Sequence, residues 1–363
     1  MNSTTSLKDR AAGAVMGSLI GDALALGPHW YYDLEELRRN YGEWITGYTD
    51  PMPGHYHEEL KAGQPSQSGV ITTMLLRSVV ENEGYKEEDF CRRLDEDLFP
   101  LLDGTPSNGP GGYTSQSIRG AWNRRVKQGL SWKETGVGSD TTEAAERALV
   151  IAARYAKSPA KVAELVSSNC VLTQNDQAVV AMTTAYCCVL SMLVQGHPLD
   201  TEISGKLIAM MMRSGELPFN TMPGKAGAPS QVMDPLRPLA GSFASPDALA
   251  AASSMAGAVR DPGIVIEPAW KVSLLFGMSC AIYYQLPAAY YLGARFSDDY
   301  EEGILQSVNS GGQNQARSIL TGALIGAQVG LAGIPKRFFD GLENSEELVA
   351  LALELGEQAE RGG

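Results

Sequence analysis

The chain of 363 residues carries a formal net charge of -13 at neutral pH, and 44% of its residues are hydrophobic. This charge argues against a nucleic-acid partner, because a phosphate backbone would be repelled at long range and no Lys/Arg stripe offsets the repulsion. The hydrophobic content is ordinary for a globular protein, and the length fits one large domain or two smaller ones.

Helical periodicity recurs along most of the chain. We expect helices at about 7–27, 71–81, 245–258, 270–292, 298–309, 313–332 and 345–358, with further helices after residues 140 and 175. Only the stretch GIVIEP (263–268) hints at a strand. Abundant Ala and Gly would let helix axes approach closely. The expected fold is all-α: a single compact orthogonal helical bundle over residues 7–360, with long loops around a cleft.

Three long polar segments, 46–69, 101–117 and 215–241, are rich in Gly and Pro and predict loops. Loops longer than about 12–15 residues in a compact domain are usually functional or disordered. The first two contain aromatic residues, which favours ordered loops that carry function.

Two uncharged segments, 178–196 and 319–334, are short of or barely at the roughly 20 residues that span a bilayer, and Ala, Gly and Thr dilute them. Buried core helices are the better interpretation. The five cysteines form no CxxC pattern, and the N-terminus lacks the apolar region of a signal peptide. We therefore expect buried, reduced thiols, a cytoplasmic location and no membrane partner.

Two stretches carry a resemblance to a known family. AAGAVMGSLIGDALALGPHW (11–30) and residues 286–335, which include NSGGQNQAR, resemble the opening helix and the C-terminal signature of the ADP-ribosylglycohydrolase family. Shorter segments resemble the branch that holds the jellyfish J-type crystallins; they lie at 29–33, 109–122, 140–148 and 172–179. The resemblance implies an all-α fold around two Mg²⁺ ions that help to cleave a bond at the anomeric carbon of ADP-ribose.

The chain departs from that family at the metal-binding acids. When the motif Thr-Asp-Asp-Thr-x-Met is matched on Met74, Val70 and Ile71 replace its two acids, and Gln313 and Gln315 replace those of Gly-Gly-Asp-x-Asp-Thr. Mg²⁺ prefers carboxylate oxygens, and neutral amides cannot offset the repulsion between two dications. We therefore expect no metal and no cofactor, with a single weakly bound magnesium ion as the open alternative.

Three residues are candidates for acid/base catalysis: Asp22, His29 and Asp33. An unpaired Asp is costly to bury in an Ala/Gly-rich helix, and a histidine titrates in a useful pH range. Structural hydrogen bonds are the alternative role for Asp22 and His29. The candidates for substrate binding lie at motif positions; they are Trp30, Thr72, Tyr113, Ser115, Asp140, Asn175, Asp176, Gln313, Asn314, Gln315 and Arg317.

Local patterns give further predictions. Asp140 is expected to cap a helix, with Glu143 closing a capping box. Arg317 stands one turn into a helix, where a cation is unfavourable, and is expected to pair with an acid or an anionic ligand. His55 and His57 could share a metal, although a solvated loop is the favoured interpretation.

The expected function is a hydrolase that acts on a glycosidic or similar bond of a small ribosyl- or nucleotide-like substrate, without dinuclear magnesium, as a monomer or homodimer. The alternative is a non-catalytic, crystallin-like structural or ligand-binding protein. An open cleft lined by Asp22, His29, Tyr113 and Gln313 would favour chemistry. A closed pocket filled by Val70 and Ile71 would favour the structural role.

Overall fold

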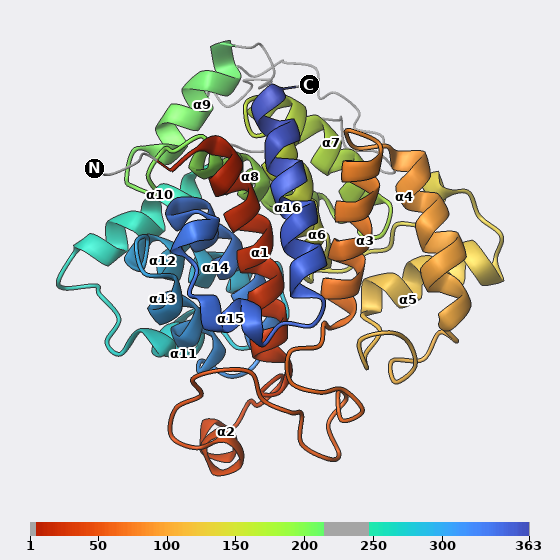
Figure 1. Cartoon of the computed structure of the whole chain (residues 1–363), viewed down its shortest axis with the longest axis horizontal. Coiled ribbons are helices and arrows are strands. Elements are labelled where there is room, and N and C mark those ends of the chain that lie inside the picture. The colour runs from red at the N-terminus through yellow and green to blue at the C-terminus, as the bar shows by residue number, and fades with distance from the viewer. Residues whose placement is uncertain (1–4, 214–246, 363) are drawn as a thin grey trace, which may run out of the picture.

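A computed structural model of the chain describes residues 5–213 and 247–362. Its central element is α1 (Leu7–Leu26), which packs against α14 (Asn314–Val329) more extensively than any other helix pair and also against α16 (Ser345–Arg361). Figure 1 shows α1 in the middle of the bundle, with α16 beside it. The first and last parts of the chain thus form the middle of one all-α fold.

Glycines allow α1 and α14 to approach closely. Gly13 and Gly17 of α1 face Gly326 and Gly322 of α14, and a Cβ at any of these four positions would collide with a carbonyl oxygen of the opposite helix. Gly21 meets the carbonyl of Ser318 in the same way. The closeness predicted from the small residues is therefore present at this interface.

The other helices surround this pair. Those in the first half are α2 (Leu34–Tyr41), α3 (Gln67–Glu81), α4 (Glu87–Arg93), α5 (Gln116–Trp122), α6 (Glu143–Arg154), α7 (Pro159–Val171) and α8 (Gln177–Val194). Those in the second half are α9 (Ile203–Arg213), α10 (Asp247–Arg260), α11 (Val272–Phe276), α12 (Ile282–Arg295), α13 (Tyr300–Val308) and α15 (Lys336–Asp340). Short 3-10 or π turns are Leu94–Leu98, Phe99–Leu101, Asn123–Lys127, Trp132–Glu134, Ala269–Lys271 and Leu331–Gly333.

Two predictions about secondary structure are wrong. The expected helix 270–292 is interrupted at Gly277, whose φ of 124° lies outside the helical range. The expected strand at 263–268 is a turn, because the N–H groups of Ile264 and Val265 both bond to the Asp261 carbonyl. The expected loop 215–241 lies outside the described residues.

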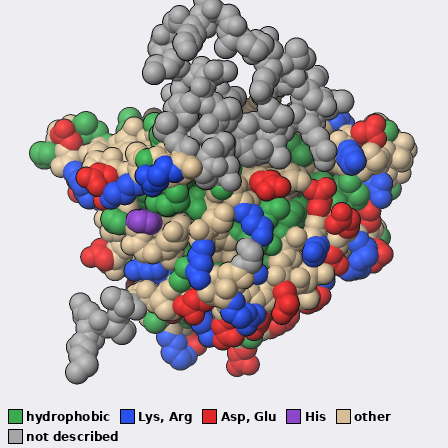
Figure 2. Space-filling model, turned by 90° about the horizontal axis from the view of Figure 1, so that it is seen from above, with side chains coloured by type: hydrophobic (Ala, Val, Ile, Leu, Met, Phe, Trp, Pro, Cys, Tyr) green, Lys and Arg blue, Asp and Glu red, His purple; other side chains and the backbone are tan. Residues whose placement is uncertain are grey.

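The apolar segments behave as core helices. Within the described part of the chain, α8 is the one helix long and apolar enough to cross a membrane, and 78% of that stretch is buried inside the protein. Four of the five cysteines are buried, and Cys280 is half-buried. On the face shown in Figure 2, basic and acidic side chains are interspersed.

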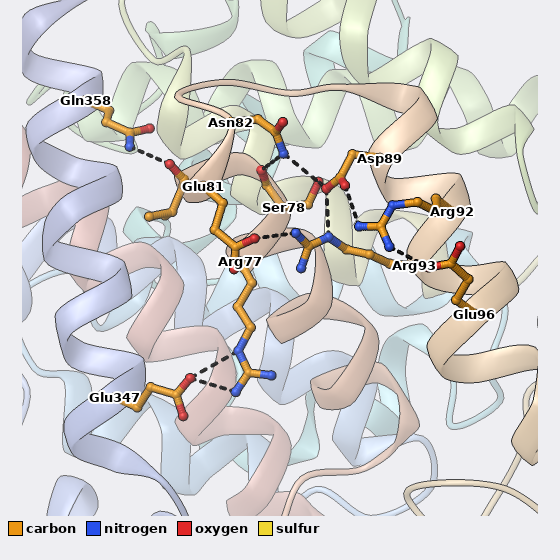
Figure 3. A network of polar contacts seen from close by, with 11 residues as sticks. Arg77, Ser78, Glu81, Asn82, Asp89, Arg92, Arg93, Glu96, Glu347 and Gln358 are labelled. Atoms are coloured by element: carbon orange, nitrogen blue, oxygen red, sulfur yellow. Dashed lines mark hydrogen bonds and ion pairs between the residues drawn. The ribbon is translucent and has the colours of Figure 1, made fainter.

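A polar network fastens α3 to α4 (Figure 3). Asp89 of α4 accepts hydrogen bonds from Ser78 Oγ at 2.7 Å and from Arg93 Nε at 2.7 Å, and it pairs with Arg92 at 2.7 Å. Burial opposes the charge of Asp89, but the hydrogen bonds from Arg92, Arg93 and Ser78 outweigh it and hold its pKa well below the usual range. A separate ion pair, from Arg77 of α3 to Glu347 of α16 at 2.7 Å, joins α3 to α16.

We expect Asp89→Asn to lower the free energy of unfolding at pH 7 by about 1–2 kcal/mol, since charge-assisted hydrogen bonds are lost from a partly exposed site. A depressed folded-state pKa stabilises the protein above the unfolded value near 4 and loses this effect as pH falls. The deficit should therefore shrink below about pH 4. Urea unfolding of Asp89→Asn and the parent protein at pH 7 and pH 3.5 measures the difference in their free energies of unfolding. The exposed Asp97→Asn is the control, and an equal deficit at both pH values would contradict the assignment.

Candidate functional site

A cavity of about 90 Å³ lies where the loop after α1 meets the starts of α3, α6 and α14. Ser66, Gln67 and Ser68 line it from the start of α3, and Gln313 and Gln315 from the start of α14. A larger groove of about 1200 Å³ between α15 and α16 joins an apolar side to charged residues that are exposed to solvent, such as Lys336 and Glu346. Perturbed acids beside convergent polar groups make the smaller cavity the candidate site.

Two carboxyl groups from the first turn of α6 face the cavity. Glu143 and Glu146 are three residues apart and share one side of the helix. Burial and the nearby charge of Glu143 raise the pKa of Glu146 to about 7, and burial also raises the pKa of Glu143. Because the two charges repel, the pair titrates as a unit and holds a proton near neutral pH.

Hydroxyl groups hold the two acids in place. Thr142 Oγ1 donates to Glu146 Oε1 at 2.5 Å, and Thr141 Oγ1 donates to Glu143. The predicted capping box is wrong: the N-cap of α6 is Thr142, which makes no side-chain cap bond. Gln174 Oε1 instead accepts from the backbone N–H of Ala144 at 2.8 Å, which leaves Glu143 free to face the cavity.

The apolar stripe of α6 could have identified Glu143 and Glu146 from the sequence, but the capping-box prediction assigned Glu143 another role. Leu149, Ala152 and Ala153 form the apolar stripe that turns α6 toward the core. Extending the stripe one turn back reaches Glu146, and a further turn reaches Glu143. A carboxylate on a buried stripe is costly unless it has partners or a function, so the extended stripe points to both residues.

Asp22 lies behind the cavity wall. It is buried near the end of α1 and accepts hydrogen bonds from Ser66 N at 2.9 Å, Ser66 Oγ at 2.6 Å and Gln315 Nε2 at 2.9 Å. Burial raises its pKa to about 6, despite these hydrogen bonds. Gly69 passes so close that a Cβ there would collide with the carboxylate. Asp22 thus positions two residues that line the cavity.

A chain of side chains joins two buried histidines to the cavity. His57 Nδ1 lies 2.8 Å from the Gly111 carbonyl, His57 Nε2 lies 2.8 Å from His29 Nδ1, and His29 Nε2 lies 3.2 Å from Gln313 Oε1. Trp30 Nε1 donates to the same Gln313 oxygen. Burial lowers the pKa of His57 to about 4 and that of His29 well below its ordinary value, so both rings are neutral at pH 7.

The solvated loop predicted for His55 and His57 is wrong for His57, which is buried. His55 Nε2 instead lies 3.0 Å from the Tyr31 hydroxyl. The two rings therefore have different partners and do not form a shared metal site.

Aromatic rings form the wall between this cavity and an outer one of about 340 Å³. Trp30 stacks on His29 at 4.1 Å and meets the edges of Tyr113 at 4.4 Å and Tyr56 at 5.1 Å between ring centroids. Trp30 has a φ of 65°, a strained conformation for a large side chain. The backbone N–H of Trp30 donates to the Gly312 carbonyl at 3.0 Å, and this bond holds the strained backbone against the start of α14.

Several predicted site residues lie outside the cavity, on the exposed ends of helices. Asp33 caps α2 by accepting from Glu35 N at 2.9 Å, and Asp176 caps α8. The exposed Asp140 accepts from the Tyr283 hydroxyl at 2.6 Å. Asn175, next to Asp176, does not line the cavity. His29, Trp30, Tyr113, Ser115, Gln313 and Gln315 are the predicted residues that do line it.

Three other predicted residues are buried behind the wall. Thr72 donates to the Glu146 carbonyl at 3.1 Å, and Asn314 Nδ2 donates to the Val308 carbonyl at 3.2 Å. The acid partner predicted for Arg317 is not found among the described residues; Arg317 donates to neutral acceptors, Gln285 Oε1 at 3.0 Å and the Gly311 carbonyl at 2.6 Å. Burial lowers its pKa to about 9. Arg317 therefore supports the glycine turn before Gln313.

The profile of one protein family matches residues 3–363, and that family is ADP-ribosylglycohydrolase. The chain belongs to the ADP-ribosylglycohydrolase family. An uncharacterized protein of Archaeoglobus fulgidus is 24% identical over 352 residues, which cover 97% of each chain. Crystallin J1A of Tripedalia cystophora is 26% identical over 154 residues, which cover 40% of this chain and 44% of the crystallin.

Among solved structures, an ADP-ribosylglycohydrolase-related protein complex is similar with a TM-score of 0.62 and 19% identity, over 98% of this chain and 100% of that one. The match and the all-helical structure confirm the predicted fold class, and the family match confirms the predicted resemblance. The likeness to the crystallin is confirmed for part of the chain only.

The residues of this ADP-ribosylglycohydrolase family member do not fit the magnesium pair that the family implies. Gln315 turns its NH₂ group, a donor, toward Asp22, and the oxygens of Asp22 already accept three hydrogen bonds. Val70 and Ile71 do not line the cavity. Within residues 5–213 and 247–362, no three His, Cys, Asp or Glu side chains converge as metal ligands. Hard cations need oxygen ligands, which an amide NH₂ group cannot supply.

Proposed function

We propose that this protein is a hydrolase that cleaves a glycosidic or similar bond of a small polar substrate, without a metal pair. The observation that carries the proposal is the Glu143–Glu146 pair: both residues line the cavity, burial raises the pKa of Glu143, and burial and the charge of Glu143 raise the pKa of Glu146 to about 7. Two carboxyl groups, one protonated and one ionised, are the groups that acid/base cleavage of a glycosidic bond requires.

In the proposed reaction, Glu146 donates its proton to the leaving-group oxygen or nitrogen as the bond to the anomeric carbon breaks. The Glu143 carboxylate accepts a proton from the water molecule whose oxygen forms the new bond to that carbon. After the reaction Glu146 is ionised and Glu143 is protonated. Transfer of this proton from Glu143 to Glu146 restores the starting state. Gln315, positioned by Asp22, provides hydrogen bonds to the substrate.

Hydrolysis of a panel of 4-nitrophenyl glycosides, followed by absorbance with and without EDTA, tests the proposal. We expect at least one glycoside to be hydrolysed at a rate that EDTA leaves unchanged, and an unchanged thermal midpoint with the chelator, because no three His, Cys, Asp or Glu side chains of the described residues converge as metal ligands. Loss of activity with EDTA, and its recovery with added Mg²⁺, would contradict the metal-independent mechanism.

A non-catalytic role remains the second candidate, and the similarity to crystallin J1A over 40% of the chain favours it. A binding or structural protein would hydrolyse none of the glycosides, and Glu146→Gln would then change ligand affinity alone. Glycoside hydrolysis that is lost in Glu146→Gln would support the hydrolase and exclude the non-catalytic role.

A further inference from the structure

We infer that the cavity selects a hydrogen-bond-donating cation, the ammonium group of a small amine-bearing ring, rather than the phosphate of a nucleotide. The inference rests on the proposed function, because it names the substrate class of the same cavity. Three independent features of the wall support it: its charge, its count of donors and acceptors, and its aromatic rings.

The charge of the wall is negative. Among the described residues that line the inner and outer cavities, Glu143 and Glu146 are acidic and none is Lys or Arg. The nearby Arg119 donates to the Thr114 carbonyl and does not line either cavity. A phosphate here would meet like charge with no cation to pair with, whereas an ammonium group would be attracted.

The wall also has one acceptor too many. The Gly111 carbonyl can only accept, so His57 donates from Nδ1, and its neutral Nε2 must then accept from His29 Nδ1. The indole N–H of Trp30 can only donate, which fixes Oε1 of Gln313 as the acceptor. His29 Nε2 therefore carries a lone pair that faces the Gln313 oxygen at 3.2 Å.

Two acceptor atoms, His29 Nε2 and Gln313 Oε1, therefore lie side by side, and His29 is only 4% exposed. A buried acceptor without a donor is unfavourable. A ligand N–H that reaches His29 Nε2 from the cavity would supply the missing donor. The unmatched lone pair is independent of the carboxylates, and it calls for the same kind of ligand. An anion, which brings only acceptors, would add to the mismatch.

The sizes of the two cavities orient the ligand. The inner cavity of about 90 Å³ has the volume of only a few water molecules, so it admits a head group rather than a whole nucleotide. The outer cavity of about 340 Å³ shares His29, Trp30, His57 and Tyr113 with it and can hold a ring. Aromatic faces attract cations, and the Arg119 guanidinium carbon, 5.7 Å from the Tyr113 ring centroid, is an example of a cation held beside this wall.

Isothermal titration calorimetry at pH 8 with three matched ligands tests the inference. These are trans-4-aminocyclohexanol, cyclohexane-1,4-diol and 4-hydroxycyclohexanecarboxylate, which share a ring and differ in charge. We expect the amine to bind at least about tenfold more tightly than the diol, and the carboxylate to bind more weakly than both. Trimethylation of the amine keeps the charge, removes the N–H donors and should weaken binding.

Glu143→Gln should abolish the preference for the amine over the diol, whereas Asp33→Asn, at the exposed cap of α2, should keep it. Carboxylate binding as tight as amine binding, unchanged affinity after trimethylation, or no amine binding up to about 10 mM would each overturn the inference. Because these ligands undergo no turnover, selective amine binding without glycoside hydrolysis would contradict only the proposed enzyme. Hydrolysis without amine selectivity would contradict only this inference.

Discussion

Glu146→Gln is expected to lower the rate of glycoside hydrolysis by about 10²–10⁴-fold, the range that one acid/base group contributes. The amide keeps the size of the side chain and can still accept from Thr142 Oγ1, but it cannot release a proton. Glu143→Gln should reduce the rate as strongly, because the two carboxyl groups act as a unit. Initial rates at saturating substrate measure both losses.

Stability separates a catalytic loss from a folding loss. The pKa of Glu146 is raised to about 7, so the ionised form is unfavourable in the folded protein; this cost grows as pH rises from the unfolded value of about 4.3 and is complete above about 7. Replacing Glu146 with Gln removes this cost at pH 8, and the variant should melt at or above the temperature of the parent protein. Asp33→Asn, which keeps a good capping residue, should leave the rate unchanged.

The pH profile gives a second readout of the same pair. Glu146 must be protonated to donate, so the rate should fall as pH rises above about 7. The rate should also fall at acidic pH, where the ionised member of the pair becomes protonated. Burial raises the pKa of Glu146 most, and the charge of Glu143 raises it further; hydrogen bonds from Ser68 and Thr142 lower it, and Asp22 contributes a smaller increase. A rate that stays constant from pH 6 to about 9 would exclude Glu146 as the proton donor.

The sequence predicted the fold well because its main determinants are local. Periodic apolar stripes and capping residues such as Ser6 and Asp176 set the helices, and small residues marked the face of α1 that meets α14. Predictions failed where a distant residue replaced a local partner. Gln174 supplies the acceptor for the start of α6, and this contact across 30 positions cannot be read from the local pattern.

The site was predictable only in part, for a related reason. The motif positions 313 and 315 led to the cavity wall, because the family resemblance fixes their place at the start of a helix. At α3, by contrast, matching the motif on Met74 pointed to Val70 and Ile71, whereas Ser66, Gln67 and Ser68 face the cavity. A shift of a few residues along a helix changes which side chains point inward, and a single sequence cannot fix that register.

Gly17→Ala should lower the free energy of unfolding by roughly 3 kcal/mol, at the upper end of the usual cost of overpacking. Alanine is intrinsically better than glycine in a helix by about 1 kcal/mol, so the local effect alone would stabilise α1. The added Cβ, however, collides with the Gly322 carbonyl, which belongs to rigid helix backbone and cannot rotate away. Chemical denaturation measures the net change.

Gly205→Ala in α9 is the matched control, since nothing lies within 4 Å of its added Cβ. It should be neutral or stabilising by up to about 1 kcal/mol. Because α14 begins with the residues that line the cavity, any outward shift of this helix in Gly17→Ala should also displace Gln315 from Asp22. A destabilised Gly17→Ala with lowered hydrolysis, beside an unaffected Gly205→Ala, would tie the close helix contact to the site. Equal stability of the two variants would contradict it.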